Sequence, residues 1–177
     1  MDETGIQFDM PPRYIWAKKG GNTKLSKGEK NSYRMTVVLT IRRDGLKLPI
    51  LFIVKGEPGG LIEKSEFKTY PSSHYYAIQK KAWMNASLWE WYLWNVLAER
   101  VEGESLLILD NFECHVSKEA LETSQVVGFN VVPLPANATS HCQPLDVSIM
   151  APFKRHLRDM WLAEDIGTSV DDALSTF

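Results

Sequence analysis

The sequence predicts an α/β domain in which helices flank a mixed β-sheet. Two β-branched segments separated by a tight-turn signal predict an antiparallel hairpin early in the chain. Strand-like apolar segments and helix-like amphipathic segments then alternate towards the end. Antiparallel strands followed by alternating units favour helices on the faces of a mixed sheet, because each element must bury its apolar side.

Length and composition indicate one folded domain. The chain has 177 residues, of which 44% are hydrophobic, so it can build a sizeable core. It has no run long enough to cross a membrane and no signal-peptide pattern, so we expect a soluble intracellular protein without a membrane partner. Its two cysteines, Cys114 and Cys142, are too few for a disulfide scaffold. Each has a histidine neighbour, but small buried hydrophobes are favoured over a zinc site.

The first elements are the hairpin strands. Residues 34–42 and 47–54 are rich in β-branched and aliphatic side chains, and Asp44-Gly45 between them is a turn signal. A weakly patterned stretch follows and contains one short candidate strand at residues 75–78. The hairpin therefore supplies the antiparallel part of the sheet.

A helix rich in aromatic residues is the next element. Asn85 or Ser87 is its expected cap, and Gly103 its expected end. Its apolar positions are Leu88, Trp89, Trp91, Tyr92, Trp94, Val96 and Leu97. Aromatic side chains at helical spacing are typical of a core, although stacking on nucleic-acid bases is the alternative.

Alternating units complete the chain. We expect a strand at residues 106–110, a helix at 117–126 between Ser117 as cap and Gly128 as stop, and a strand at 129–134. The four aliphatics before Asp110 predict a strand buried on both faces. A last helix follows, with apolar residues at helical spacing. This is the element order of the ribonuclease H-like fold, provided that the opening segment pairs beside residues 106–110.

Three separated aspartates are the candidate catalytic residues. Asp110 stands at the carboxyl end of a predicted buried strand, and Asp146 at the amino end of the last helix. Asp2 joins them if the opening segment lies in the sheet. Clustered carboxylates raise one another's pKa values and persist where cations neutralise them, and oxygen ligands favour Mg²⁺ or Mn²⁺. The alternatives are structural: Asp2 as a frayed end, Asp110 in a turn with Asn111, and Asp146 as an N-cap.

Several motifs together resemble the DDE superfamily endonuclease domain of pogo-, Tigger- and jerky-like transposases. The most specific are a Leu-Asp-Asn box and a Gln-Pro-Leu-Asp box, in this order and spacing. Supporting them are an Asp-Glu-Thr-Gly box, Arg-Met-Thr-Val, a histidine and the Leu-Pro-Ala-Asn segment. In this chain the motifs begin at Asp2, Arg34, Leu109, His115, Leu134 and Gln143.

The resemblance implies a ribonuclease H-like catalytic core, at residues 1–163, with an acidic tail at residues 164–177. It implies that Asp2, Asp110 and Asp146 hold two Mg²⁺ or Mn²⁺ ions, and that the domain cuts DNA and joins a 3′-hydroxyl to target DNA. It also implies a truncated first strand, a nuclear location and a possible homo-oligomer. Asn111, His115 and Gln143 match motif positions without a defined role.

Two functions from different classes remain open at this point. One is a metal-dependent DNA endonuclease and strand transferase, or its degenerate remnant. The other is a non-catalytic, domesticated nucleic-acid-binding or chromatin protein. A ribonuclease or exonuclease with the same fold is a more distant third, because the Gln-Pro-Leu-Asp box argues against it.

A basic loop is the candidate nucleic-acid contact. Between residues 13 and 34 the chain has seven basic residues and one acid, although its net charge is −2. Flexible basic loops suit a phosphate backbone, and a solvated surface loop is the alternative. The candidate contacts are Lys18, Lys19, Lys24, Lys27, Lys30 and Arg34.

Overall fold

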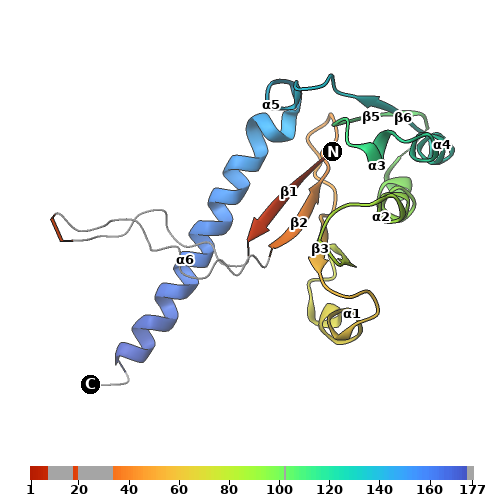
Figure 1. Cartoon of the computed structure of the whole chain (residues 1–177). Coiled ribbons are helices and arrows are strands. Elements are labelled where there is room, and N and C mark those ends of the chain that lie inside the picture. Colours follow the sequence, from red (N-terminus) through yellow and green to blue (C-terminus); the bar gives the residue numbers. More distant parts are fainter. Residues whose placement is uncertain (8–17, 20–33, 102, 175–177) are drawn as a thin grey trace.

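The computed structural model describes residues 1–7, 18–19, 34–101 and 103–174, and it confirms an α/β architecture (Figure 1). A four-stranded mixed sheet has the order β1-β2-β3-β4. Its strands are β1 (Asp2–Gln7), β2 (Arg34–Leu39), β3 (Leu51–Lys55) and β4 (Tyr75–Gln79). The β1–β2 and β2–β3 pairs are antiparallel, and the β3–β4 pair is parallel. A separate parallel pair consists of β5 (Ser105–Leu109) and β6 (Phe129–Pro133).

The predicted hairpin is confirmed, but its ladder is interrupted near the turn. Gly45 has φ 86°, and the Asp44 carboxylate accepts a hydrogen bond from the Leu46 N–H at 3.0 Å. Beyond Leu39 the two strands are joined by a single bridge between Ile41 and Lys47. Pro49 has no N–H to donate, so it weakens the ladder at that point.

The aromatic helix is α2 (Ala86–Tyr92), which continues as η2 (Leu93–Leu97) and η3 (Ala98–Arg100). The Asn85 side chain caps it by accepting from the Leu88 N–H at 2.9 Å. Trp89 and Tyr92 are buried, whereas Trp91 and Trp94 face outwards. The prediction of a core helix therefore holds for one face only. Two short elements before it, α1 (Leu61–Ser65) and η1 (Glu66–Thr69), were not predicted.

The unit around β5 follows the local signals, with one correction. Helix α4 (Lys118–Val127) is capped by Ser117, which accepts from the Ala120 N–H at 3.2 Å, and ends at Gly128 with φ 104°. It is preceded by the short α3 (Glu113–Val116). The expectation that β5 is buried on both faces is wrong: Leu106 is 69% exposed and Ile108 47% exposed. The aliphatic run is covered only on the side of Leu107 and Leu109, which belong to the core with α2.

The last segment crosses the other face of the first sheet. It consists of α5 (Thr139–Cys142), η4 (Leu145–Ile149) and the long helix α6 (Met150–Leu174), which lies beside β1 in Figure 1. Leu145 and Met150 pack with Ile6, Val37 and Leu39 in a second core. Helix α6 runs through most of the segment that the sequence analysis treated as a tail. Among the described residues, no helix is both long and apolar enough to span a membrane.

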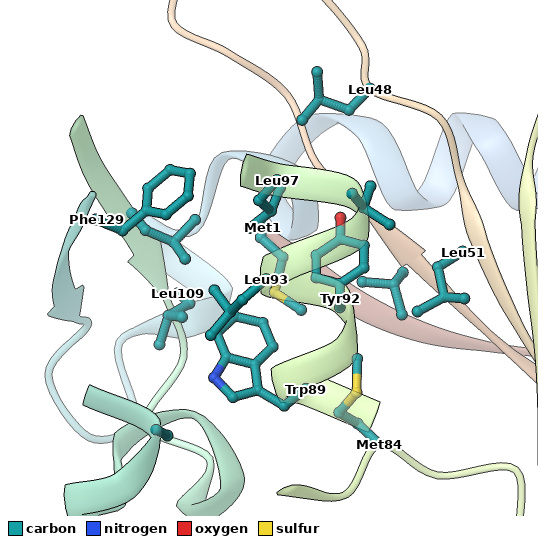
Figure 2. Close-up of a cluster of buried hydrophobic side chains, with 14 of the residues drawn as sticks. Met1, Leu48, Leu51, Met84, Trp89, Tyr92, Leu93, Leu97, Leu109 and Phe129 are labelled. Carbon is teal, nitrogen blue, oxygen red and sulfur yellow. The ribbon is translucent and has the colours of Figure 1, made fainter. Parts of the chain in front are cut away.

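The main core lies between α2 and the strands (Figure 2). Its largest buried side chains include Trp89, Tyr92 and Leu109. The Tyr92 hydroxyl is 2.7 Å from the Thr40 hydroxyl, so the polar end of this ring is satisfied. Met1 joins the same core, and its terminal ammonium donates to the Ile108 carbonyl at 3.0 Å. The start of β1 therefore reaches β5 through a single backbone bond.

Candidate functional site

Asp2 is the first residue of β1, and its side chain is buried. Its Oδ1 accepts from the Glu3 N–H at 2.8 Å, while its buried Oδ2 has no hydrogen-bond partner. Burial, together with the negative charges of Asp146 and Asp110, raises the pKa of Asp2 to about 7, against the opposing effect of the Glu3 N–H. An unpartnered buried carboxylate oxygen requires either a proton or a cation.

Asp110 follows the last residue of β5, at the carboxyl end of the strand. Its Oδ1 is 3.0 Å from His115 Nδ1 and accepts from the Phe112 N–H at 3.4 Å. The hydrogen bond from His115 is the largest cause that holds the pKa of Asp110 below its usual value. Asp110 is therefore ionised and oriented by His115.

Asp146 lies in the first turn of η4 and is exposed. Its neighbour Leu145 is 1% exposed and anchors this turn in the second core. The N-cap position belongs to Pro144, and no side chain caps this helix. The structural explanation of Asp146 as an N-cap is therefore wrong, because its carboxylate does not cap the helix.

The structure brings the three predicted aspartates together from three separate elements. Asp2 interacts electrostatically with both Asp146 and Asp110. All donors are carboxylate oxygens, and this donor type fits Mg²⁺ or Mn²⁺. Within the described part of the chain, however, no group of three or more histidine, cysteine, aspartate or glutamate side chains is arranged to hold a metal ion. The three aspartates suit such an ion in donor type and charge. Their side chains, however, are not arranged to coordinate one ion together.

A histidine ion-pair cluster adjoins the aspartates, and sequence reasoning left its role undefined. His115 is 1% exposed, and its Nε2 is 3.0 Å from Glu3 Oε1. Its ring packs against Trp89, with centroids 4.4 Å apart. Burial alone would lower the pKa of His115, but its hydrogen bonds to Asp110 and Glu3, together with neighbouring Cys114, raise that pKa to about 11. His115 is therefore an imidazolium between two carboxylates.

Glu3 is the residue that sequence reasoning missed. Successive side chains of a strand point to opposite faces, so Asp2 and Glu3 leave β1 on opposite sides. Glu3 points to the side of α3, where His115 lies. The strand alternation and the second acid of the Asp-Glu-Thr-Gly box were the available signals for it.

Gln143 has a structural role in this site. It is 2% exposed, and its Nε2 donates to the Met1 carbonyl at 3.1 Å. This bond ties the segment before Asp146 to the start of β1, next to Asp2. Asn111 is exposed, and no role for it follows from its contacts.

The predicted DNA contacts are only partly described. Lys18 and Lys19 are exposed, and Arg34 lies with its guanidinium 4.8 Å from the ring centroid of Trp83. Lys24, Lys27 and Lys30 lie outside the described residues. Both cysteines are free thiols, and Cys142 is exposed, which corrects the expectation that it is buried.

Comparison with known families agrees with this geometry. Residues 32–173 match the model of the DDE superfamily endonuclease family. The chain belongs to that family. Asp110 and Asp146 lie inside the matched range, and Asp2 precedes it. DDE transposases generally use divalent metal ions, in agreement with the all-oxygen donor set.

Relatives of this DDE domain include two proteins called Pogo transposable element with KRAB domain. The mouse protein is 27% identical over 164 residues, and the human protein 26% identical over the same length. These matches cover 89% of this chain and 26% of each relative. The human Pogo transposable element with ZNF domain is 26% identical over 132 residues, covering 71% of this chain and 9% of that protein. The chain thus spans about a quarter or less of these relatives.

A solved structure supports the ribonuclease H-like fold. The Mos1 transposase paired-end complex with left transposon end matches with a TM-score of 0.59 at 17% identity. The match covers 92% of this chain and 45% of the Mos1 chain. At this identity the likeness shows the fold alone.

Proposed function

We propose that this DDE domain is a metal-dependent DNA endonuclease and strand transferase. The observation that supports it most directly is the convergence of Asp2, Asp110 and Asp146 from β1, the end of β5 and η4. Asp2 is repelled by both other carboxylates, and such repulsion destabilises the charged forms unless cations neutralise them. Asp2, Asp110 and Asp146 are the residues we assign to metal binding and catalysis.

Each of the three aspartates has its own role in this proposal. Two bound Mg²⁺ or Mn²⁺ ions would activate a water or a 3′-hydroxyl and stabilise the leaving oxygen of a phosphodiester. Asp2 offers its unpartnered Oδ2, and Asp110 offers a carboxylate kept ionised by His115. Asp146 is exposed, so that side of the site is open to a nucleic-acid backbone.

DNA is the proposed partner, and the cell nucleus the proposed location. The Mos1 transposase structure is a paired-end complex with a left transposon end, which supports DNA as the ligand of this domain. We assign the backbone contacts to the basic residues Lys18, Lys19, Lys24, Lys27, Lys30 and Arg34. Cationic side chains bind phosphates without sequence preference, so their contribution is expected to weaken as salt increases.

Titration calorimetry with Mg²⁺ and Mn²⁺ tests the catalytic proposal directly. The wild-type chain is expected to bind, and Asp110→Asn to lose binding. Asp159→Asn is the matched control, because Asp159 is an exposed acid on α6. A cleavage assay on duplex DNA with the same three proteins follows. Metal binding that survives in Asp110→Asn, or its absence from all three proteins, would reject the assignment.

A non-catalytic nucleic-acid-binding or chromatin protein is the second candidate. It is favoured by the His115 cluster, in which His115 pairs with Glu3 and Asp110 without a metal. DNA binding measured in EDTA and in Mg²⁺ separates the two proposals. Equal affinity in both buffers, with no cleavage, would favour the second candidate.

A further inference from the structure

Two of the three aspartates are held in the same way, each by one of its carboxylate oxygens. Asp2 Oδ1 accepts from the Glu3 N–H at 2.8 Å. Asp110 Oδ1 lies 3.0 Å from His115 Nδ1 and also accepts from the Phe112 N–H at 3.4 Å. In both residues Oδ1 is engaged within the protein, so Oδ2 is the oxygen that each can offer to a ligand.

The bond to Asp110 is fixed because the His115 ring is held at both of its nitrogens. Nδ1 faces Asp110 and Nε2 faces Glu3, each at 3.0 Å. Carboxylates only accept hydrogen bonds, so the ring donates through both nitrogens. His115 is 1% exposed, and Trp89 packs against it with ring centroids 4.4 Å apart. Rotation of the ring would break both bonds, and unpaired polar groups are costly in a buried site.

Glu3 is the fixed end of this arrangement. Its backbone pairs with Val38 in the β1–β2 ladder, and its side chain is 16% exposed. Figure 1 shows α3, the helix that carries His115, next to the start of β1. Asp2 and Glu3 are adjacent in β1, so one strand supplies a candidate ligand and also holds the imidazole that orients the next one.

A carboxylate that offers a single oxygen suits some divalent cations better than others. Mg²⁺ is small, keeps near-ideal octahedral geometry and retains several waters, so it needs few protein oxygens. Ca²⁺ takes roughly six to eight oxygens at longer distances, and carboxylates often bind it through both oxygens. Engagement of Oδ1 in Asp2 and Asp110 removes the second oxygen of each. This restriction costs more affinity for Ca²⁺ than for Mg²⁺.

We propose that Glu3 is a positioning residue that, through His115, restricts Asp110 to one ligand oxygen and thereby selects Mg²⁺ over Ca²⁺. This inference rests on the proposed function, because it concerns the ions that the three aspartates bind. Glu3 does not contact the ion: strand alternation directs its side chain to the opposite side of β1 from Asp2, where His115 lies. It determines whether Asp110 can turn Oδ1 towards a larger ion.

The competing explanation is that the Glu3–His115 contact only stabilises the fold. Its loss would then lower the melting temperature and weaken the binding of every ion by the same factor. The proposal predicts a change in the ratio of the Ca²⁺ and Mg²⁺ dissociation constants, because only Ca²⁺ gains from a released Oδ1. This ratio therefore separates a positioning role from a purely structural one.

Titration of Mg²⁺ and of Ca²⁺ into four forms of the full chain tests the proposal. The forms are the wild type, Glu3→Ala, Glu3→Gln and, as control, Glu90→Ala at an exposed position of α2. Glu3→Ala is expected to lower the ratio of the Ca²⁺ Kd to the Mg²⁺ Kd about tenfold, the scale of one hydrogen bond to a charged group. Glu3→Gln keeps an oxygen acceptor for His115 Nε2, so it is expected to keep the wild-type ratio, as is the control.

Two outcomes of this titration would overturn the proposal. One is the same ratio in all four proteins, whatever their melting temperatures. The other is a Glu3→Gln ratio equal to that of Glu3→Ala, because the charge of Glu3 rather than its hydrogen bond would then be responsible. Absence of Mg²⁺ and Ca²⁺ binding by the wild type would overturn the proposed metal site, and this inference with it.

A measurement on the wild type decides the matter if Glu3→Ala does not fold. The Nδ1–H proton of His115 is followed by NMR with isotope-labelled histidine, without metal and with saturating Mg²⁺. The hydrogen-bonded Nδ1–H signal is expected to persist with Mg²⁺, because Asp110 binds the ion through Oδ2 alone. Loss of that signal on Mg²⁺ binding would overturn the proposal, while the proposed function would stand because the ion is bound.

Discussion

The two halves of the carboxylate site differ in how their charge is compensated. In one half, His115 lies 3.0 Å from both Glu3 and Asp110, so one imidazolium forms an ion pair with each of two carboxylates. In the other half, Asp2 faces a second acid, Asp146, and its buried Oδ2 has no hydrogen-bond partner. The first half is satisfied as folded, whereas the second requires a proton or a cation.

This difference separates a structural part of the site from a functional part. The His115 half joins β1 to the segment after β5, across 112 residues of sequence. It fixes the position of Asp110. A bound ion would add little stability there, because Glu3 and Asp110 already have His115 as their partner. A bound ion would stabilise the folded state most in the Asp2 half. Its charge would cancel the repulsion between Asp2 and Asp146 that folding creates.

Replacing His115 is expected to have the largest effect. His115→Ala leaves Glu3 and Asp110 without their cation and opens a space beside Trp89, whose ring is 4.4 Å from that of His115. Breaking a buried ion pair in this way costs about 3–5 kcal/mol of unfolding free energy. Urea unfolding measures it, with His156→Ala at an exposed position of α6 as control. A loss no greater than that of the control would show that the cluster contributes little.

The pH dependence of stability is the next largest effect. The pKa of His115 is raised to about 11 in the folded chain, from its ordinary value of 6.5. The folded state therefore holds a proton that the unfolded state releases, so this contribution is complete below pH 6.5 and is lost as pH rises towards 11.

Between pH 7 and pH 10 we expect a loss of about 2–4 kcal/mol in the wild type relative to His115→Gln. Glutamine does not titrate in this range, so the other titrating groups largely cancel in the difference. Parallel stability curves for the two proteins would contradict the imidazolium assignment.

A smaller fall of stability with rising pH is expected at Asp2. Its pKa is raised from 3.8 to about 7, so the folded state favours the protonated form and wild-type stability falls as pH rises through this window. Asp2→Asn removes that fall. At pH 8, without metal, the variant is expected to be about 1–2 kcal/mol more stable than the wild type, after allowance for solvent screening. Thermal unfolding at pH 4 and pH 8 checks this, because the gain disappears at the lower pH.

Local signals predicted the parts of the fold that neighbouring residues determine. Ser117 and Gly128 bound α4 as expected, because an N-cap hydroxyl and a left-handed glycine act within one turn. The hairpin turn at Gly45 formed for the same reason. Asp2, Asp110 and Asp146 were chosen as candidates because each lies within a family motif, and Asp110 and Asp146 also stand at the ends of predicted elements.

Features that depend on distant parts of the chain were not predictable from these signals. Leu106 and Ile108 belong to an aliphatic run that is the same in sequence whether one or both faces are covered. The Glu3–His115 pair joins residues from opposite ends of the β1–β5 segment, and no local pattern links them.

The response to Mg²⁺ is the smallest expected effect, and it distinguishes the two halves most sharply. An ion that binds only the folded state stabilises it by about 1.4 kcal/mol at ten times its Kd. If the ion neutralises the Asp2 half, Asp2→Asn and Asp110→Asn both lose this gain, although only Asp2→Asn is stabilised without metal. Thermal unfolding with and without Mg²⁺ at pH 8 gives both quantities for each protein, with Asp159→Asn as control. A gain that persists in Asp2→Asn would place the ion elsewhere, and the uncompensated charge of Asp2 would then have no functional explanation.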